Sequence, residues 1–281
     1  ARSWEVAPMK IEVCLSTFNA SWGQLADAAG TAEELGIGGL WAMDHLTGIV
    51  HERDHVLECF AVLGGLAAIT SRARLGTLVA NAGLRNPALL AQTAATLHDQ
   101  TDGRFVLGVG AGGGAGSPYA VELERVGIDH RPDPIRRQRV EEVIDVVKHL
   151  WNGNDDTYVG SHHRVGPAEG FMQPQVHPPV LVAGFGPKMA ALAGRKADMF
   201  NTIATHPDLE MLFAAVRDSA EQAQRAEPER TVFSGDERHW LDPYSPERKS
   251  LDQAAAQTLV MILYQPFDRD LLAAIAEASE G

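Results

Sequence analysis

The sequence predicts an α/β protein in which helices cover a parallel sheet, within the length range of one α/β barrel. Short apolar runs of strand length alternate with segments of helical periodicity, and glycines and prolines mark the boundaries between them. A chain of 281 residues can enclose one large core. We therefore expect a single domain over residues 9–281. Residues 1–8 lack an apolar signal core and are expected to be a flexible lead-in or an expression remnant.

In chain order, the alternation predicts strands at 11–15, 40–43, 75–79, 105–109, 180–183, 199–203 and 231–233. The expected helices cover 25–35, 58–70, 87–101, 140–151 and 209–220. The run 257–264 stays open between a strand and a helix. Its apolar residues Leu259, Ile262 and Leu263 suit a helix, whereas its length suits a buried strand. Whether the eighth βα unit is complete is therefore left open.

Residues typical of helix ends lie between these elements and support the alternation. Asn86 and Asp133 each precede a proline, so each is expected to cap a helix that begins at that proline. Gly36 and Gly103 follow expected helices, where a left-handed residue commonly ends the last turn. Two connections are unusually long. The first, 110–133, follows the fourth strand and is expected as a lid on the catalytic face; the second, 152–179, is expected to hold a small hairpin around 158–165.

Composition narrows the possible partners and the compartment. The formal net charge of -13 disfavours nucleic acid and anionic membranes, so a small molecule is the expected partner. Cys14 and Cys59 provide no disulfide framework, which indicates a reducing compartment and predicts a cytoplasmic protein. No apolar run approaches the roughly 18 residues of a membrane span.

The strongest candidates for chemistry are Asp44 and His45, at the end of the second expected strand. Side chains there face the active site of a barrel, and a histidine titrates near neutrality, so His45 is a candidate for proton transfer. A carboxylate beside it suits a polar cofactor edge. The alternative is a capped strand end with a hydrogen-bonded histidine.

Two glycine-rich segments suggest contact with phosphate. At 183–188 a strand ends in glycines and a helix begins at Pro187, which predicts a phosphate seat, with an empty tight turn as the alternative. The segment 108–113 matches the dinucleotide fingerprint, but it follows the fourth strand instead of the first. For that segment we favour a glycine-rich transition from strand to loop.

Other titratable residues suggest no site. The histidines at 51, 55, 162 and 163 have no partners at ligand spacing, so we interpret them as solvated loop residues and expect no metal. The arginines at 136, 137 and 139 lie among acidic residues, and we interpret them as a salt-bridged outer helix face.

Four segments, 39–45, 75–79, 85–91 and 103–110, resemble the luciferase-like monooxygenase superfamily in residues, order and spacing. The most specific are Arg-Asn-Pro-Ala-Leu-Leu-Ala at 85–91 and Gly-Arg-Phe-Val-Leu-Gly-Val-Gly at 103–110. The resemblance covers roughly residues 9–213 and is closest to the branch that uses the deazaflavin coenzyme F420. It implies a TIM barrel that binds FMN or F420 at the carboxyl ends of its strands, usually as a homodimer.

The resemblance also implies roles for individual residues. In the deazaflavin branch an Asp-His pair, here Asp44 and His45, lies by the cofactor ring, and a cis peptide, here Leu78-Val79, supports that ring. Further matching positions would contact the cofactor ring or side chain, namely Asn81, Gly110, Ala111 and Gly112. The matching phosphate corner comprises Gly184, Phe185, Gly186, Pro187, Lys188 and Met189. Sugar-phosphate and alcohol dehydrogenases of the branch carry a proton-donating Glu where this chain has Gly113, which leaves His45 as the visible proton-transfer group.

These implications favour hydride transfer between F420 and a small organic substrate. The first alternative is an FMN-dependent monooxygenase supplied by a partner flavin reductase. The second alternative is a barrel without a cofactor that only binds or scaffolds.

Overall fold

The computed structural model describes residues 9–280, so the expected lead-in at 1–8 lies outside the described residues. The strands are β1 (Lys10–Leu15), β2 (Gly39–Ala42), β3 (Arg74–Thr77), β4 (Ala80–Asn81), β5 (Phe105–Gly110), β6 (Tyr158–Val159), β7 (Arg164–Val165), β8 (Val180–Ala183), β9 (Met199–Ile203), β10 (Glu229–Ser234) and β11 (Thr258–Leu263). The helices are α1 (Trp22–Glu34), α2 (Cys59–Ile69), α3 (Pro87–Gln100), α4 (Ala120–Arg125), α5 (Asp133–Trp151), α6 (Pro187–Lys196), α7 (Leu209–Gln222), α8 (Pro246–Gln253) and α9 (Arg269–Glu280), with 3-10 turns η1 (Gly48–His51) and η2 (Arg238–Leu241).

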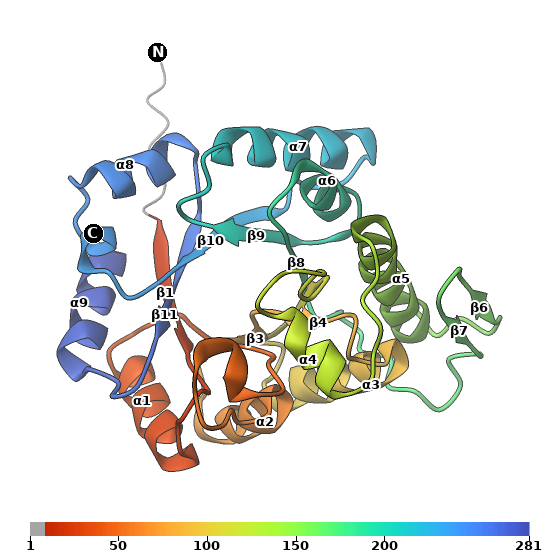
Figure 1. Ribbon diagram of the computed structural model, residues 1–281, viewed down its shortest axis with the longest axis horizontal. Helices are drawn as coiled ribbons and strands as arrows, with labels where there is room; N and C mark the ends of the chain where they lie inside the picture. The colour runs from red at the N-terminus through yellow and green to blue at the C-terminus, as the bar shows by residue number, and fades with distance from the viewer. Residues whose placement is uncertain (1–8, 281) are drawn as a thin grey trace.

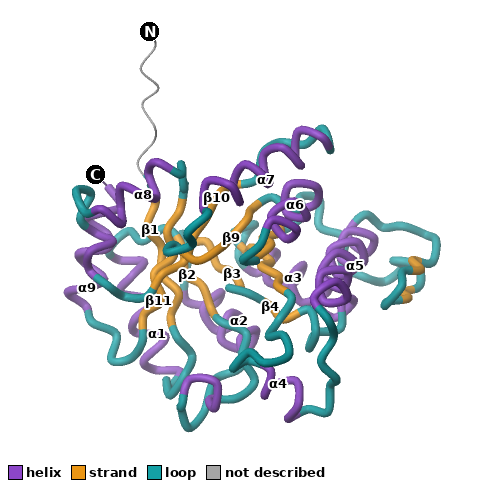
Figure 2. The backbone as a smooth tube through the Cα atoms, turned by 45° about the horizontal axis from the view of Figure 1, so that its top comes forward, coloured by secondary structure: helices purple, strands orange, loops and turns teal. Residues whose placement is uncertain are grey.

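The strands close into the eight-stranded parallel barrel that the sequence predicts. β1 pairs with β2 on one side and with β11 on the other. Around the sheet, β5 pairs with β8 and also with β3, which closes the ring, and β4 continues the barrel position of β3. Figure 1 shows the helices arranged around these strands, and Figure 2 shows the strands gathered inside them. Closure pairs the strands without leaving a sheet edge exposed.

Both faces of the strands are buried, which explains their continuous apolar runs. Trp41 faces the barrel interior, whereas its neighbours Leu40 and Ala42 face the surrounding helices. The same alternation, with two residues that follow β1 and β2, places one set of side chains inside the barrel. We call this set the inner cluster: Cys14, Phe18, Trp41, Met43, Val106, Leu181, Met199 and Val260. A strand covered on both sides shows no apolar and polar alternation. The barrel is therefore a packed core and not a pore.

The eighth βα unit is present, which resolves the open assignment at 257–264. This run forms β11, which lies between β1 and β10 in the sheet. α9 follows and packs against β1. Periodicity did not distinguish strand from helix here because both faces of β11 are buried.

The predicted helix-end residues are confirmed at most positions. Asn86 accepts hydrogen bonds from the backbone N–H groups of Ala88 (2.9 Å) and Leu89 (3.2 Å), and Gly36 and Gly103 have φ values of 89° and 88°. The expected hairpin is β6 with β7, beyond α5 in Figure 1. The capping role of Asp133 was wrong: α5 begins at Asp133, Pro132 precedes it, and no side chain caps the helix.

Charged residues close the amino-terminal end of the barrel. Arg74 lies between two carboxylates, donating from Nε to Glu12 (2.9 Å) and from both terminal nitrogens to Glu229 (3.1 Å each). Glu12 also accepts from Trp41 Nε1 (2.7 Å), and Glu229 accepts from Thr258 (2.6 Å). These groups satisfy one another around the buried carboxylate of Glu12. Among residues 9–280, no helix has the length and apolar character needed to cross a membrane.

Candidate active site

The residues predicted to hold a cofactor come from four segments at one end of the barrel. The pair 44–45 follows β2, the bulge 78–79 joins β3 to β4, the loop 110–112 ends β5, and the corner 184–189 follows β8. Because the strands are parallel and closed, their carboxyl ends meet at the same face, which we call the mouth. The bond between Leu78 and Val79 is cis, as the resemblance implies.

Asp44 binds protein groups with both carboxylate oxygens. Its side chain is fully buried. Oδ2 accepts hydrogen bonds from the backbone N–H of Asn81 (3.0 Å) and from Nε of Arg85 (3.1 Å). Oδ1 accepts a hydrogen bond from Nη2 of Arg85. Arg85 also pairs with Glu58 (2.5 Å) and lies over the Phe60 ring. Asp44 therefore ties the end of β2 to the segment after the cis peptide, a positioning role that the sequence did not reveal.

Close packing explains the glycines of the 108–113 segment. Thr77 Oγ1 donates to Gly108 O (2.7 Å) and accepts from Gly108 N (2.9 Å), and a Cβ at this glycine would overlap the Thr77 carbonyl oxygen. A Cβ at Gly110 would lie 2.6 Å from a Val79 methyl group. These glycines let β5 approach the bulge, which supports the strand-to-loop interpretation over the dinucleotide fingerprint.

The loop after β5 is held by the Arg136 side chain and packs closely against the Asn81 side chain. Gly112 has a φ of +68°, and a Cβ there would overlap the amide of Asn81, which itself accepts from Gly83 N (2.9 Å). Arg136 donates to the carbonyl oxygens of Ala111 (3.3 Å from Nε) and Gly112. The interpretation of Arg136 as an outer-face residue was therefore wrong, although it also pairs with Asp133 (2.8 Å). Helical spacing alone did not show that this face of α5 meets the loop.

A half-buried apolar platform covers the inner cluster at the mouth. Leu78, Val79, Ala183, Phe233 and Ile262 pack against that cluster without being fully buried themselves. They come from the ends of strands around the barrel or from the bulge that follows β3. An apolar platform with polar groups at its margin suits a planar aromatic ring.

His45 has a charged partner that the sequence reasoning missed. Its Nδ1 lies 3.0 Å from Oε2 of Glu122, and the other carboxylate oxygen accepts the backbone N–H groups of Leu46 (2.6 Å) and Thr47 (3.3 Å). Glu122 lies in α4, within the long connection that was expected to cover the catalytic face. The position of Glu122 in this connection was the sequence signal that could have indicated a residue at the active site. No sequence motif links Glu122 to His45, because 77 residues separate them.

Aromatic rings surround His45. Phe18 lies 5.1 Å from it between ring centroids, Tyr119 stacks at 5.7 Å, and His51 lies edge-on at 5.6 Å. The interpretation of His51 as a solvated loop residue was wrong, because it also contacts Phe18 and Tyr264. Burial, followed by the charge of His45, lowers the pKa of His51. His51 is therefore neutral at neutral pH, and His45 differs from it in having a carboxylate oxygen 3.0 Å from Nδ1.

The corner between β8 and α6 presents backbone N–H groups. Gly186 is the N-cap residue in extended conformation, Pro187 begins α6, and no side chain caps the helix. Within residues 9–280, nothing accepts a hydrogen bond from the backbone N–H of Gly186 or Lys188. Phe185 is 63% exposed and meets Phe233 edge-on, so the corner lies beside the apolar platform. This arrangement suits a phosphate group.

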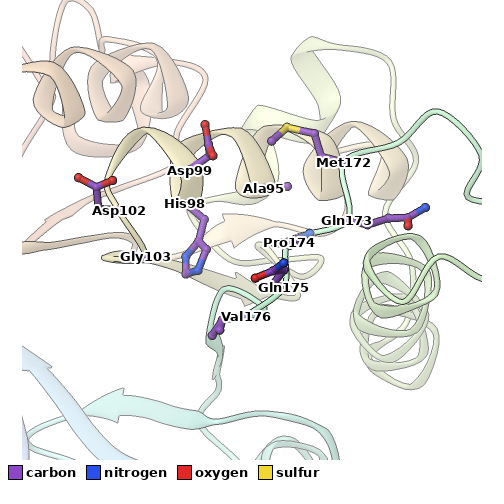
Figure 3. Close-up of a pocket in the computed structure, with 10 residues that line it drawn as sticks. All are labelled: Ala95, His98, Asp99, Asp102, Gly103, Met172, Gln173, Pro174, Gln175 and Val176. Carbon is purple, nitrogen blue, oxygen red and sulfur yellow. The ribbon is translucent and has the colours of Figure 1, made fainter.

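A cavity lies at the other end of the barrel. Its volume is about 450 Å³, and Figure 3 shows His98, Asp102, Met172 and Gln175 among its lining residues. Gly103, also in its wall, precedes β5, so the cavity lies by the amino-terminal end of that strand. It is separate from the mouth and from every residue proposed to bind the cofactor.

Comparisons with known proteins show which family the chain belongs to. The chain is 34% identical over 224 residues to an F420-dependent glucose-6-phosphate dehydrogenase of Kineococcus radiotolerans. This alignment covers 78% of this chain and 65% of the relative. It is 33% identical to a phthiodiolone/phenolphthiodiolone dimycocerosates ketoreductase of Mycobacterium tuberculosis, over 69% of this chain and 55% of the relative. The chain thus spans less than two thirds of the length of these curated relatives.

Solved structures share the fold. An F420-dependent secondary alcohol dehydrogenase in complex with an F420-acetone adduct superposes with a TM-score of 0.81 at 19% identity, over 96% of this chain and 98% of the other. The coenzyme F420 dependent tetrahydromethanopterin reductase of Methanopyrus kandleri gives 0.75 at 17% identity, over 97% and 98%. The family model described as luciferase-like monooxygenase matches residues 9–235. The chain therefore belongs to the luciferase-like monooxygenase family.

Proposed function

We propose that this protein is a coenzyme F420-dependent oxidoreductase that transfers a hydride between the deazaflavin and a small organic substrate. The observation that carries the proposal is the position of His45 at the mouth, held by Glu122 and close to the apolar platform. The F420-dependent dehydrogenases among the curated relatives support the choice of cofactor.

The residues at the mouth fit such a cofactor. The platform of Leu78, Val79, Ala183, Phe233 and Ile262 offers an apolar surface for a planar ring. The N–H groups of Gly186 and Lys188 need an acceptor, and the positive end of the α6 dipole favours an anion there. The cofactor would thus have its ring on the platform and its phosphate at the α6 corner.

The protein's part in the reaction is to bind, to orient and to move one proton. When bound, the deazaflavin would supply a ring that exchanges two electrons as a hydride and reacts poorly with oxygen. Hydride transfer to or from a carbonyl, alcohol or imine requires one proton to move alongside. We assign that proton to Nε2 of His45, because Nδ1 is engaged by Glu122.

Asp44 and Arg136 would act without touching the reacting atoms. Asp44 secures the segment after the cis peptide, and Arg136 secures the carbonyl oxygens of the loop after β5. Asn81, Gly110, Ala111 and Gly112 lie in or beside these two supports, so we propose that they shape the ring's surroundings.

The decisive experiment is anaerobic titration of the purified protein with F420 and, separately, with FMN, followed by absorbance and fluorescence. We expect saturable binding of F420. Reduction of bound F420 by candidate alcohols, or its reoxidation by candidate carbonyls, would then identify the substrate. Binding of neither cofactor would favour the cofactor-free barrel.

An FMN-dependent monooxygenase is the second candidate. A Type II Baeyer-Villiger monooxygenase component from Pseudomonas putida, solved in complex with FMN, shares the fold with a TM-score of 0.73 at 14% identity, over 96% of this chain and 98% of that one. Binding of FMN but not F420, with substrate-dependent oxygen consumption in the presence of a flavin reductase, would replace the first proposal with this one.

The resemblance also implies a homodimer, and we keep that as a proposal. Sedimentation of the purified protein would show a mass of twice 30.3 kDa if it is correct.

A further inference from the structure

Glu122 reaches across the mouth from the loop after β5 to the end of β2. Its side chain is 3% exposed, and both of its oxygens are engaged. One accepts the backbone N–H groups of Leu46 and Thr47, and the other lies 3.0 Å from Nδ1 of His45. The carboxylate is therefore oriented by the backbone that follows His45 and cannot turn away without losing these bonds.

The charge state of Glu122 follows from its surroundings. Burial by itself would raise the pKa of the carboxyl, but the hydrogen bond and charge of His45 and the two backbone N–H groups outweigh it. The pKa of Glu122 therefore lies below its usual range, and the group is ionised at neutral pH. An ionised carboxylate only accepts hydrogen bonds.

This charge state specifies which nitrogen of His45 carries the proton. Opposite an acceptor, Nδ1 of the neutral imidazole must be the N–H, and Nε2 is left with its lone pair. Nε2 is then the atom that can take a proton at the mouth. When the ring becomes protonated, the carboxylate beside Nδ1 stabilises its positive charge.

We propose that Glu122 is the positioning residue that sets the tautomer and orientation of His45. This inference rests on the proposed function in one respect, because the proposed function is what assigns the transferred proton to Nε2 of His45. Glu122 lies in α4, in the connection after β5, and its carboxylate lies beside the imidazole of His45. It acts on the imidazole and not directly on the substrate.

The other groups around His45 do not offer an alternative cause for the tautomer. His51 and Tyr119 contact its ring by their faces or edges, and no hydrogen bond joins either to it within the described chain. Phe18 is apolar. Glu122 is thus the hydrogen-bonding partner that selects between the two ring nitrogens.

The test is nuclear magnetic resonance of protein labelled with ¹⁵N-histidine, which needs neither cofactor nor substrate. Two-bond proton–nitrogen correlations distinguish the tautomers, and His45→Asn assigns the His45 signals among the 11 histidines. At a pH where the ring is neutral, we expect His45 to be protonated at Nδ1. In Glu122→Gln, the uncharged amide can donate as well as accept, so we expect loss of the dominant Nδ1–H signal.

Glu124→Gln is the matched control. Glu124 lies on the same helix but is 62% exposed and pairs with His130, so its replacement should leave the His45 signals unchanged. An Nε2–H tautomer in the wild type, or an unchanged tautomer in folded Glu122→Gln, would overturn the inference. Should Glu122→Gln fail to fold, the wild-type tautomer decides.

The anaerobic titration separates this inference from the proposed function. If F420 binds but His45 is protonated at Nε2, the role of Glu122 fails alone. If F420 does not bind although His45 carries its proton on Nδ1, the cofactor assignment fails and the positioning by Glu122 stands.

Discussion

Replacing Gly186 with valine should weaken cofactor binding while leaving the fold intact. Gly186 has φ −146° and ψ 160°, a conformation that suits a β-branched residue, and a Cβ there meets no atom within 4 Å. The valine side chain would stand in the space through which a phosphate approaches the first-turn N–H groups. Weakening even one charge-assisted hydrogen bond costs about 1.5 kcal/mol, which is a loss of affinity of roughly tenfold.

Fluorescence titration with F420 under anaerobic conditions measures this change, and thermal unfolding checks the fold. Gly38→Val is the matched control, because Gly38 also meets nothing within 4 Å but precedes β2 at the far end of the barrel. It should retain wild-type affinity. Gly184→Val should instead lower the melting temperature, since its Cβ would overlap that of Met189.

Unchanged affinity in a folded Gly186→Val protein would refute the reasoning. The phosphate would then lie away from α6, and the free N–H groups there would simply be solvated. Equal loss in Gly38→Val would also refute it, because the effect would not depend on the mouth.

Three further predictions concern proton transfer and stability. His45→Asn should lower turnover roughly 10²- to 10⁴-fold, with F420 affinity nearly unchanged, as measured by steady-state kinetics and titration; turnover close to wild type would make His45 a binding or structural residue. Arg74→Met should lower the free energy of unfolding by about 3 kcal/mol in urea denaturation, because it leaves the carboxylate of Glu12, 3% exposed, without its charged partner; a loss below about 1 kcal/mol would show that water reaches the site. The pH dependence of the unfolding free energy follows from Glu229. Burial raises the pKa of its carboxyl, but the hydrogen bonds and charge of Arg74 outweigh burial and hold this pKa below the ordinary 4.5. A carboxyl with a depressed folded pKa stabilises the fold fully above its unfolded value and loses that contribution as the pH falls through the folded value. Unfolding free energy should therefore fall below about pH 4.5 in the wild type and fall less in Arg74→Met, and parallel pH curves for the two proteins would contradict this.

Local patterns in the sequence were sufficient for most of the barrel. Asn86 before Pro87 predicted the start of α3, and Gly36 and Gly103 predicted the left-handed residues after two helices. These signals succeed because capping and positive φ depend on a few neighbouring residues. The family resemblance added the position of the cis bond at Leu78-Val79.

The site was predicted only in outline. The sequence placed Asp44 and His45 at the end of β2, but it did not show that the Asp44 carboxylate is engaged by Asn81 and Arg85. The position of a residue after a predicted parallel strand indicates at which end of the barrel it lies. It carries no information about which group, many residues away, reaches its oxygens or nitrogens.

The amino-acid sequence by itself determined the alternation of strands and helices and the end of the barrel that holds the candidate chemistry. Only the tertiary structure decided that 257–264 is a strand, because closure of the barrel buries both of its faces. It also decided that Glu122 meets His45 and that Arg136 holds the loop after β5. Such contacts join residues far apart in the chain, so they depend on how the whole barrel packs and leave no periodic trace in the sequence.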